Sequence, residues 1–242
     1  MKQNGQNKMF PLVDLSTPMQ RLVGLALANA EHSWLIPVVV SPDNRLELYG
    51  FFRHIVAAHG SSESERVIGN ELPSVIELER DDETSLLVLN GEDLPKRHQR
   101  TILNYRHNFP VVMIAVRPGS EQITQGTGWL EEFHDACAPL PLSWPTWEER
   151  GADHDRIISL IRDRLSMPSG VPVPEFDGMA VDYLKSTPFD GTQSVERAIK
   201  GALNRYIQAC SAGSLEFRHF TALRAARILL GRKEFPPISV VR

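Results

Sequence analysis

Short apolar runs separated by helix-like segments constrain the fold of this chain more than any other feature. The first run, Leu35–Val40, is apolar throughout and rich in β-branched residues, which is typical of a strand buried on both faces. Three further runs lie at 74–78, 85–89 and 111–116, and a proline-rich run at 138–142 suits an edge strand. Alternating strands and helices predict a parallel sheet covered by helices, with right-handed crossovers.

Helix signals occupy the segments around these runs. Ser16-Thr17-Pro18 offers a capping residue and a proline at the start of a helix. Residues 46–58 are also helix-like, an amphipathic helix begins at Asp155, and apolar residues follow one stripe over 193–210. The Pro, Gly and Ser residues of 167–174 predict a linker before that last helix.

Composition limits the environment and the partners. A net charge of −4 gives no global attraction for nucleic acid or acidic membranes, so any such contact needs a local patch. Cys137 and Cys210 are too few for a disulfide framework, which favours a reducing compartment. The N-terminus lacks an apolar signal sequence and no stretch is long enough to cross a bilayer, so we expect a cytoplasmic protein without membrane contact.

Five ordered fragments resemble the central AAA+ ATPase domain of bacterial enhancer-binding proteins, the activators of sigma-54 RNA polymerase. Residues 17–40 are similar to the first helix and the strand that leads into the phosphate loop. Residues 85–104 and 110–120 are similar to the strand of the second nucleotide motif with its DLP helix start, and to the sensor strand. Residues 139–161 resemble the LPPLRER segment, and 183–203 occupy the place of the WPGNVREL lid motif.

The resemblance implies an α/β fold class, with a three-layer parallel-sheet core of the AAA+ (P-loop NTPase-like) type and a small C-terminal helical lid subdomain. We expect a flexible N-terminus over 1–15, the core over 16–168, the lid over 174–215 and a basic tail over 216–242.

The phosphate loop of that family is chemically replaced. Such a loop needs glycines that let backbone N–H groups reach phosphate, then a lysine and a Ser/Thr that holds magnesium. Residues 41–48 contain no glycine but do contain a proline and added acids, and Leu48 stands near the lysine position. We therefore expect phosphate to be repelled here.

The other nucleotide groups are replaced as well. The acids that hold magnesium and orient water should follow the strand at 85–89, but Asn90-Gly91 stand there, and Glu92 with Asp93 belong to the following turn. Arg117 is the only polar candidate at the end of the sensor strand. The resemblance also places Leu130 and Ala136 where arginine fingers would fall, and Ser194 at the lid arginine. Residues 59–84 contain no GAFTGA loop, which argues against sigma-54 remodelling.

These losses predict a protein that is not an enzyme and has no cofactor: a regulator or scaffold acting through protein contacts, with an active AAA+ relative or a copy of itself. Three tryptophans in the region facing the neighbouring subunit in active relatives are candidates for partner binding, with core packing as the alternative: Trp129, Trp144 and Trp147. A second hypothesis is a nucleotide or second-messenger module using Arg45 and Arg117. A third is nucleic-acid binding through Arg218, Arg224 and Arg227 of the basic tail, although the sequence argues against nucleic acid as the main partner. The scattered histidines predict no metal site.

Overall fold

The structure, a computed structural model, describes residues 16–60, 65–68, 84–119, 128–137, 141–165, 176 and 178–211. The chain forms two compact units, Met1–Arg150 and Gly151–Arg242. The flexible N-terminus, the linker at 167–174 and the basic tail predicted from the sequence lie outside the described residues.

The first unit is built on a parallel sheet with the strand order β2-β3-β4-β1-β5. Its strands are β1 (Leu35–Val39), β2 (Glu65–Ile68), β3 (Ser85–Val88), β4 (Val112–Val116) and β5 (Leu142–Ser143). Every described residue of β1, β3 and β4 is buried, as their continuous apolar sequence predicts. The α/β class with a parallel sheet is therefore confirmed.

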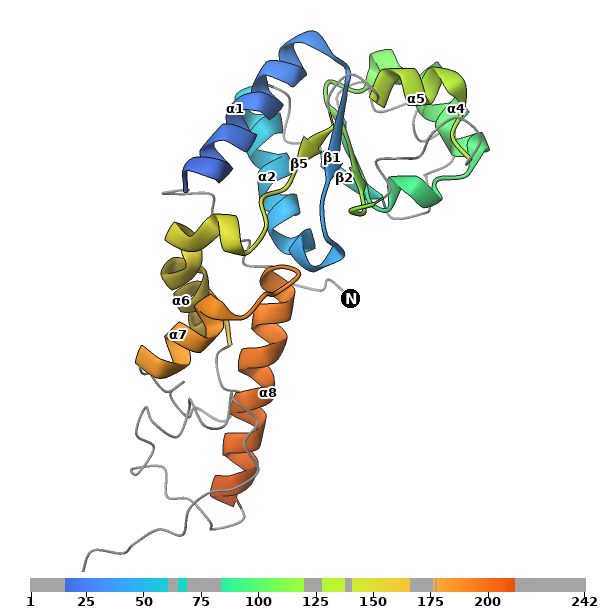
Figure 1. The fold of residues 1–242 in the computed structure, drawn as a ribbon. Coiled ribbons are helices and arrows are strands. Elements are labelled where there is room, and N and C mark those ends of the chain that lie inside the picture. Colours follow the sequence, from blue (N-terminus) through green and yellow to red (C-terminus); the bar gives the residue numbers. More distant parts are fainter. Residues whose placement is uncertain are drawn as a thin grey trace, which may run out of the picture. The chain divides into compact units, whose positions relative to one another are not determined.

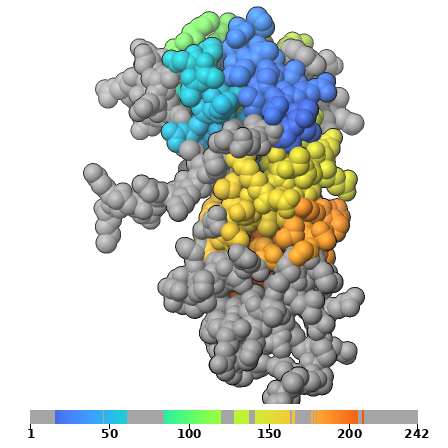
Figure 2. Space-filling view, turned by 90° about the vertical axis from the view of Figure 1, so that its left-hand side faces the viewer, coloured from blue at the N-terminus to red at the C-terminus, as the bar shows by residue number. Residues whose placement is uncertain are grey.

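Helices cover both faces of this sheet (Figure 1). The helices α1 (Thr17–His32) and α2 (Arg45–Ala58) lie on one face, and α4 (Lys96–Asn104) and α5 (Glu131–Cys137) lie on the other. α1 begins directly after Ser16 with proline in its first turn, as the sequence predicted. Figure 2 shows α1 and α2 side by side at the surface of this unit. The result is the expected three-layer arrangement.

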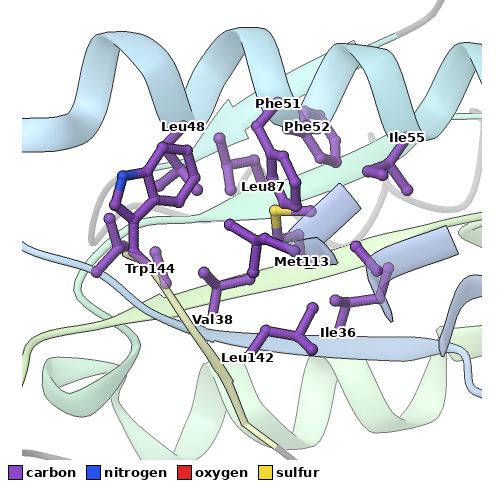
Figure 3. Close-up of a cluster of buried hydrophobic side chains, with 14 of the residues drawn as sticks. Ile36, Val38, Leu48, Phe51, Phe52, Ile55, Leu87, Met113, Leu142 and Trp144 are labelled. Atoms are coloured by element: carbon purple, nitrogen blue, oxygen red, sulfur yellow. The ribbon is translucent and has the colours of Figure 1, made fainter. Parts of the chain in front are cut away.

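A separate hydrophobic cluster fills each side of the sheet. Under α1 and α2, side chains of α2 at helical spacing point onto residues from four strands (Figure 3); the α2 residues are Leu48, Phe51, Phe52 and Ile55. Under α4 and α5, the opposite faces of β1, β3 and β4 meet Ile102, Leu103 and Phe133. The alternation of side chains along each strand divides the core in this way.

Pro37 lies inside β1, an unusual place for a residue without a backbone N–H. The N–H of Val40 points to β4, where it donates to the carbonyl oxygen of Val116, so alternate residues face opposite neighbours. Pro37 therefore faces the β5 side. β5 pairs only with Val38 and Val39 of β1. Pro37, which has no N–H to donate, therefore lies just before the paired segment.

The edges of the sheet differ in part from the sequence prediction. β2 was missed, because no apolar run was recognised at 65–68, which pairs with β3 at the sheet edge. The predicted strand at 74–78 lies outside the described residues. The predicted edge strand at 138–142 is confirmed in position, since β5 lies at the other edge, although the strand begins only at Leu142.

The second unit is helical in its described part. It contains α6 (His154–Arg164), α7 (Gly178–Ser186) and α8 (Thr192–Ser211), and α6 packs against both other helices. The ammonium of Lys185 on α7 lies 2.7 Å from a carboxylate oxygen of Asp155 on α6. The sequence assigned α6 to a core ending at 168, but its contacts group it with α7 and α8, because its apolar stripe faces them. That this unit acts as a lid stays a prediction.

Candidate functional site

The carboxyl ends of β1, β3 and β4 surround a hollow in the first unit, at the edge of a parallel sheet where ligands usually bind. It is lined by Ser41, Pro42 and Arg45 from the β1–α2 turn, by Asn90 after β3 and by Arg117 after β4. Its empty volume is about 230 Å³ with the open solvent at its mouth included. Because that volume includes open solvent, the enclosed space in the hollow is smaller still, and the hollow is small for a nucleotide.

The turn between β1 and α2 uses its own backbone N–H groups. Pro42 has none, and the N–H of Asp43 donates to the side-chain oxygen of Ser41 at 3.3 Å. The N–H of Asn44 donates to the carbonyl oxygen of Ser41 at 2.9 Å, and the N–H of Arg45 donates to that of Pro42. A phosphate cradle needs such groups directed outward. None of these four positions offers one.

Leu48, at the place of the phosphate-loop lysine, is fully buried. Figure 3 shows it beside Trp144, inside the cluster under α2. A side chain in this position contributes to the hydrophobic core and brings no positive charge to the hollow.

The acids beyond β3 are engaged by Arg117. The Nε of Arg117 lies 2.6 Å from Glu92 Oε1, its Nη2 lies 2.8 Å from Asp93 Oδ2, and its backbone N–H donates to Glu92 Oε2 at 3.3 Å. Glu92 and Asp93 lie in the short 3-10 helix η2 (Gly91–Asp93), in agreement with their predicted place in a turn. The carboxylates that follow β3 are thus paired with a cation of the same chain.

The turn before η2 is fixed from two further sides. The Nη2 of Arg45 donates to the side-chain oxygen of Asn90 at 2.9 Å, and Trp129 Nε1 donates to the carbonyl oxygen of Gly91 at 3.0 Å. Asn90 has φ 53°, a left-handed conformation that asparagine tolerates. A Cβ on Gly91 would clash with Cγ2 of Ile114 on β4, so only glycine fits there.

The structure brings together Arg45 and Arg117, the two residues the sequence proposed as ligand-binding. Both line the hollow, but Arg45 donates to Asn90 and Arg117 pairs with two acids. Their guanidinium groups already have partners within the protein. A ligand would have to compete with those contacts.

A buried ion pair beneath this region was not predicted. Both guanidinium nitrogens of Arg150 bind the carboxylate of Glu47 on α2, at 2.7 and 2.9 Å, and both side chains are buried. One signal in the sequence was available, because Glu47 is one turn before Phe51 on the buried side of α2, where a charge needs a partner. The pair holds the segment after β5 against the start of α2.

The structure corrects two of the three proposed partner-binding tryptophans. Trp144 and Trp147 are 7% and 3% exposed, and the ring of Trp144 packs edge-to-face on Phe51 at 5.4 Å. Large aromatic rings fill the core efficiently, so the core-packing alternative applies to both. Trp129 is half-buried and packs edge-to-face on Phe133, with a centroid distance of 5.2 Å. It keeps an exposed portion, and its partner role stays a prediction.

The remaining candidates are outside the described residues: Arg218, Arg224 and Arg227. Within the described residues, no helix is both long and apolar enough to span a membrane. The same part of the chain contains no group of three or more His, Cys, Asp or Glu residues arranged to hold a metal ion.

Solved structures of similar fold exist, although no family model and no curated protein matches the sequence. NtrX from Brucella abortus in complex with ATP has a TM-score of 0.64 at 14% identity, and the match covers 90% of this chain and 57% of that one. Domain III of the replication initiation protein DnaA from Thermotoga maritima gives 0.56 at 11%, covering 90% and 93%. A point mutant of RuvB from Thermotoga maritima gives 0.55 at 11%, covering 90% and 70%.

At these identities the similarity concerns the fold alone. The chain has an α/β, AAA+ (P-loop NTPase-like) fold, and it spans less than two thirds of the NtrX chain.

Proposed function

We propose that this chain is a catalytically inactive AAA+-like protein that acts as a regulator or scaffold through protein contacts in the bacterial cytoplasm. The observation that carries the proposal is the self-contained bonding of the β1–α2 turn, whose N–H groups from Asp43 to Arg45 all donate within the turn. The NtrX of similar fold was solved with ATP, so this fold is able to hold the nucleotide. What differs here is the local chemistry.

Charge at the hollow supports the same proposal. A triphosphate with magnesium needs free cations and free carboxylates in different places. Here Arg117 forms ion pairs with Glu92 and Asp93, and Leu48, which stands near the expected lysine position, is buried. Binding would require those ion pairs to break without a lysine to replace their charge.

The test is phosphate release by the purified chain with ATP and magnesium. We expect no turnover above buffer, because Arg45, Arg117 and the acids Glu92 and Asp93 at the hollow already bind partners within the protein. Magnesium-dependent turnover that is abolished in Asp93→Asn but kept in Asp182→Asn, an exposed acid on α7, would overturn the proposal.

The protein-contact part needs a separate measurement. Sedimentation velocity of the purified chain tests association with a copy of itself, and co-purification from the native cell tests association with an AAA+ relative. We expect a complex that forms without added nucleotide. A strictly monomeric protein with no copurifying partner contradicts this part and leaves the absence of turnover standing.

The shared position of Arg45 and Arg117 favours a second candidate, a binding module for a nucleotide or second messenger. Titration calorimetry with nucleotides separates the two. Binding that is weakened by Arg45→Ala and by Arg117→Ala, but not by Arg21→Ala on the exposed side of α1, supports the module. The absence of heat with every nucleotide supports the scaffold.

A further inference from the structure

The helix α4 presents a row of exposed cations on one side. Lys96, Arg97 and Arg100 are exposed, and at 100° per residue they fall within an arc of about 100° on the helix. The buried residues Gln99, Ile102 and Leu103 fall outside this arc. Arg106 is exposed in the 3-10 turn η3 (Arg106–Asn108), which follows the helix. We call these four cations the α4 cationic face.

These charges have no acidic partner in the described part of the chain. The sequence has no acidic residue between Asp93 and Glu121, although the whole chain carries a net charge of −4. By contrast, Arg117, Arg150 and Lys185 each form an ion pair. Among the described residues, the α4 cationic face is therefore a local concentration of positive charge without an acidic partner, in a chain of net negative charge.

The placement of these cations does not serve the helix. Lys96 and Arg97 stand in the first turn, where the helix dipole disfavours positive charge, and that turn has no acid. Neither a side-chain cap nor an acidic neighbour offsets this repulsion. Positive charges that destabilise the helix they stand on are expected where they contribute to binding another molecule.

The exposed side chains of the α4 cationic face indicate which kind of partner it binds. The hot spots of protein interfaces are enriched in aromatic rings, and single-stranded nucleic acids stack their bases on such rings. Here Phe109 is buried and Tyr105 packs partly buried against the core. Arginine and lysine without aromatic rings suit the phosphate backbone of a duplex, which is bound mainly through charge.

We propose that the α4 cationic face binds the phosphate backbone of duplex DNA without reading its sequence. This inference concerns a different segment from the basic tail. It does not depend on whether the protein turns over ATP.

The test measures the binding of a short fluorescent DNA duplex by anisotropy at several salt concentrations. We compare the wild-type chain with Lys96→Gln/Arg100→Gln. The variant is expected to bind at least about tenfold more weakly at low salt, because two phosphate contacts are lost. Its loss of affinity between about 50 and 200 mM salt is expected to be about tenfold smaller than that of the wild type.

The matched control is Arg21→Gln/Lys200→Gln, which removes one arginine and one lysine at exposed positions of α1 and α8. It should bind like the wild type, and thermal melting should show that both variants are folded. Equal weakening in both variants would assign the effect to net charge and overturn the proposal. So would binding of single-stranded DNA alone, or binding of polyglutamate without binding of duplex DNA, which would assign the face to an acidic protein.

Discussion

The carboxyl end of the sheet and the α4 cationic face both carry several charges. At the sheet end these charges have partners within the protein, whereas on α4 they have no acidic partner among the described residues. At the sheet end, Arg117 is held by two acids and Arg45 by an asparagine. On α4, Lys96 and Arg100 have no acidic partner within the described residues. Paired charges fix a backbone conformation, whereas unpaired charges are available to another molecule.

The paired charges at the sheet end stabilise the turns that follow β1 and β3. The turns that hold nucleotide in such folds need contacts to keep their shape when no nucleotide binds. Here the contacts come from side chains of the same unit, such as Trp129 and Arg45 on the Asn90-Gly91 turn. The charged groups at the carboxyl end of the sheet are thus engaged by partners within the protein.

The strongest test of the paired region is the buried ion pair beneath it. Arg150→Met should lower the free energy of unfolding by about 3–5 kcal/mol, because it leaves the Glu47 carboxylate buried without its cation. Urea denaturation followed by tryptophan fluorescence measures this loss. The double variant Glu47→Leu/Arg150→Met should regain most of it. A single variant as stable as the wild type would show that the pair does not hold this region.

The next effect concerns the fit of the Asn90-Gly91 turn against β4. Gly91→Ala should cost about 1–3 kcal/mol, since the new methyl group overlaps Ile114 and something must shift. Gly24→Ala on α1 is the control, because its Cβ meets open space, and it should stabilise the helix by up to about 1 kcal/mol. Equal melting temperatures for the two variants would contradict the close packing of this turn.

A smaller effect is expected from the ion pairs around Arg117. Its side chain is 49% exposed, so solvent screens the pairs, and Arg117→Ala should change the free energy of unfolding by less than about 1 kcal/mol. High salt should reduce the difference further. A loss as large as that of Arg150→Met would contradict the expectation that the partly exposed pairs of Arg117 stabilise the protein less than the buried Glu47–Arg150 pair.

The smallest effect is a pH dependence on α4. Burial, and then the charge of Arg97, lower the pKa of His98 below its ordinary value of 6.5. The unfolded chain therefore takes up a proton at higher pH than the folded one, and stability should fall as the pH drops from about 6.5 through the lowered pKa. Denaturation at several pH values measures this, and His98→Gln should flatten the curve. An NMR titration of His98 above 6.5 would contradict it.

Local pattern was enough to predict most of the elements. The apolar, β-branched run Leu35–Val40 suited a buried strand, and the proline after Thr17 marked the start of a helix, so β1, α1 and the parallel α/β class were predicted from the sequence. β2 could not be found in this way, because a four-residue edge strand in polar surroundings carries almost no periodicity. That the phosphate loop is replaced, with Pro42 in the loop and Leu48 near the lysine position, stays a prediction from the sequence.

Tertiary structure decided which residues that are far apart in the chain come into contact. Glu47 and Arg150 are separated by 103 positions, and no local pattern pairs them. The same holds for Arg117 with Glu92, and for Trp144, whose burial depends on Phe51 from another element. Sequence specifies which groups are present and which elements they stand on, because periodicity and backbone preference are local. Only the packed sheet specifies which charges meet and which stay open to a partner, because ion pairs depend on distances between segments that are far apart in the chain.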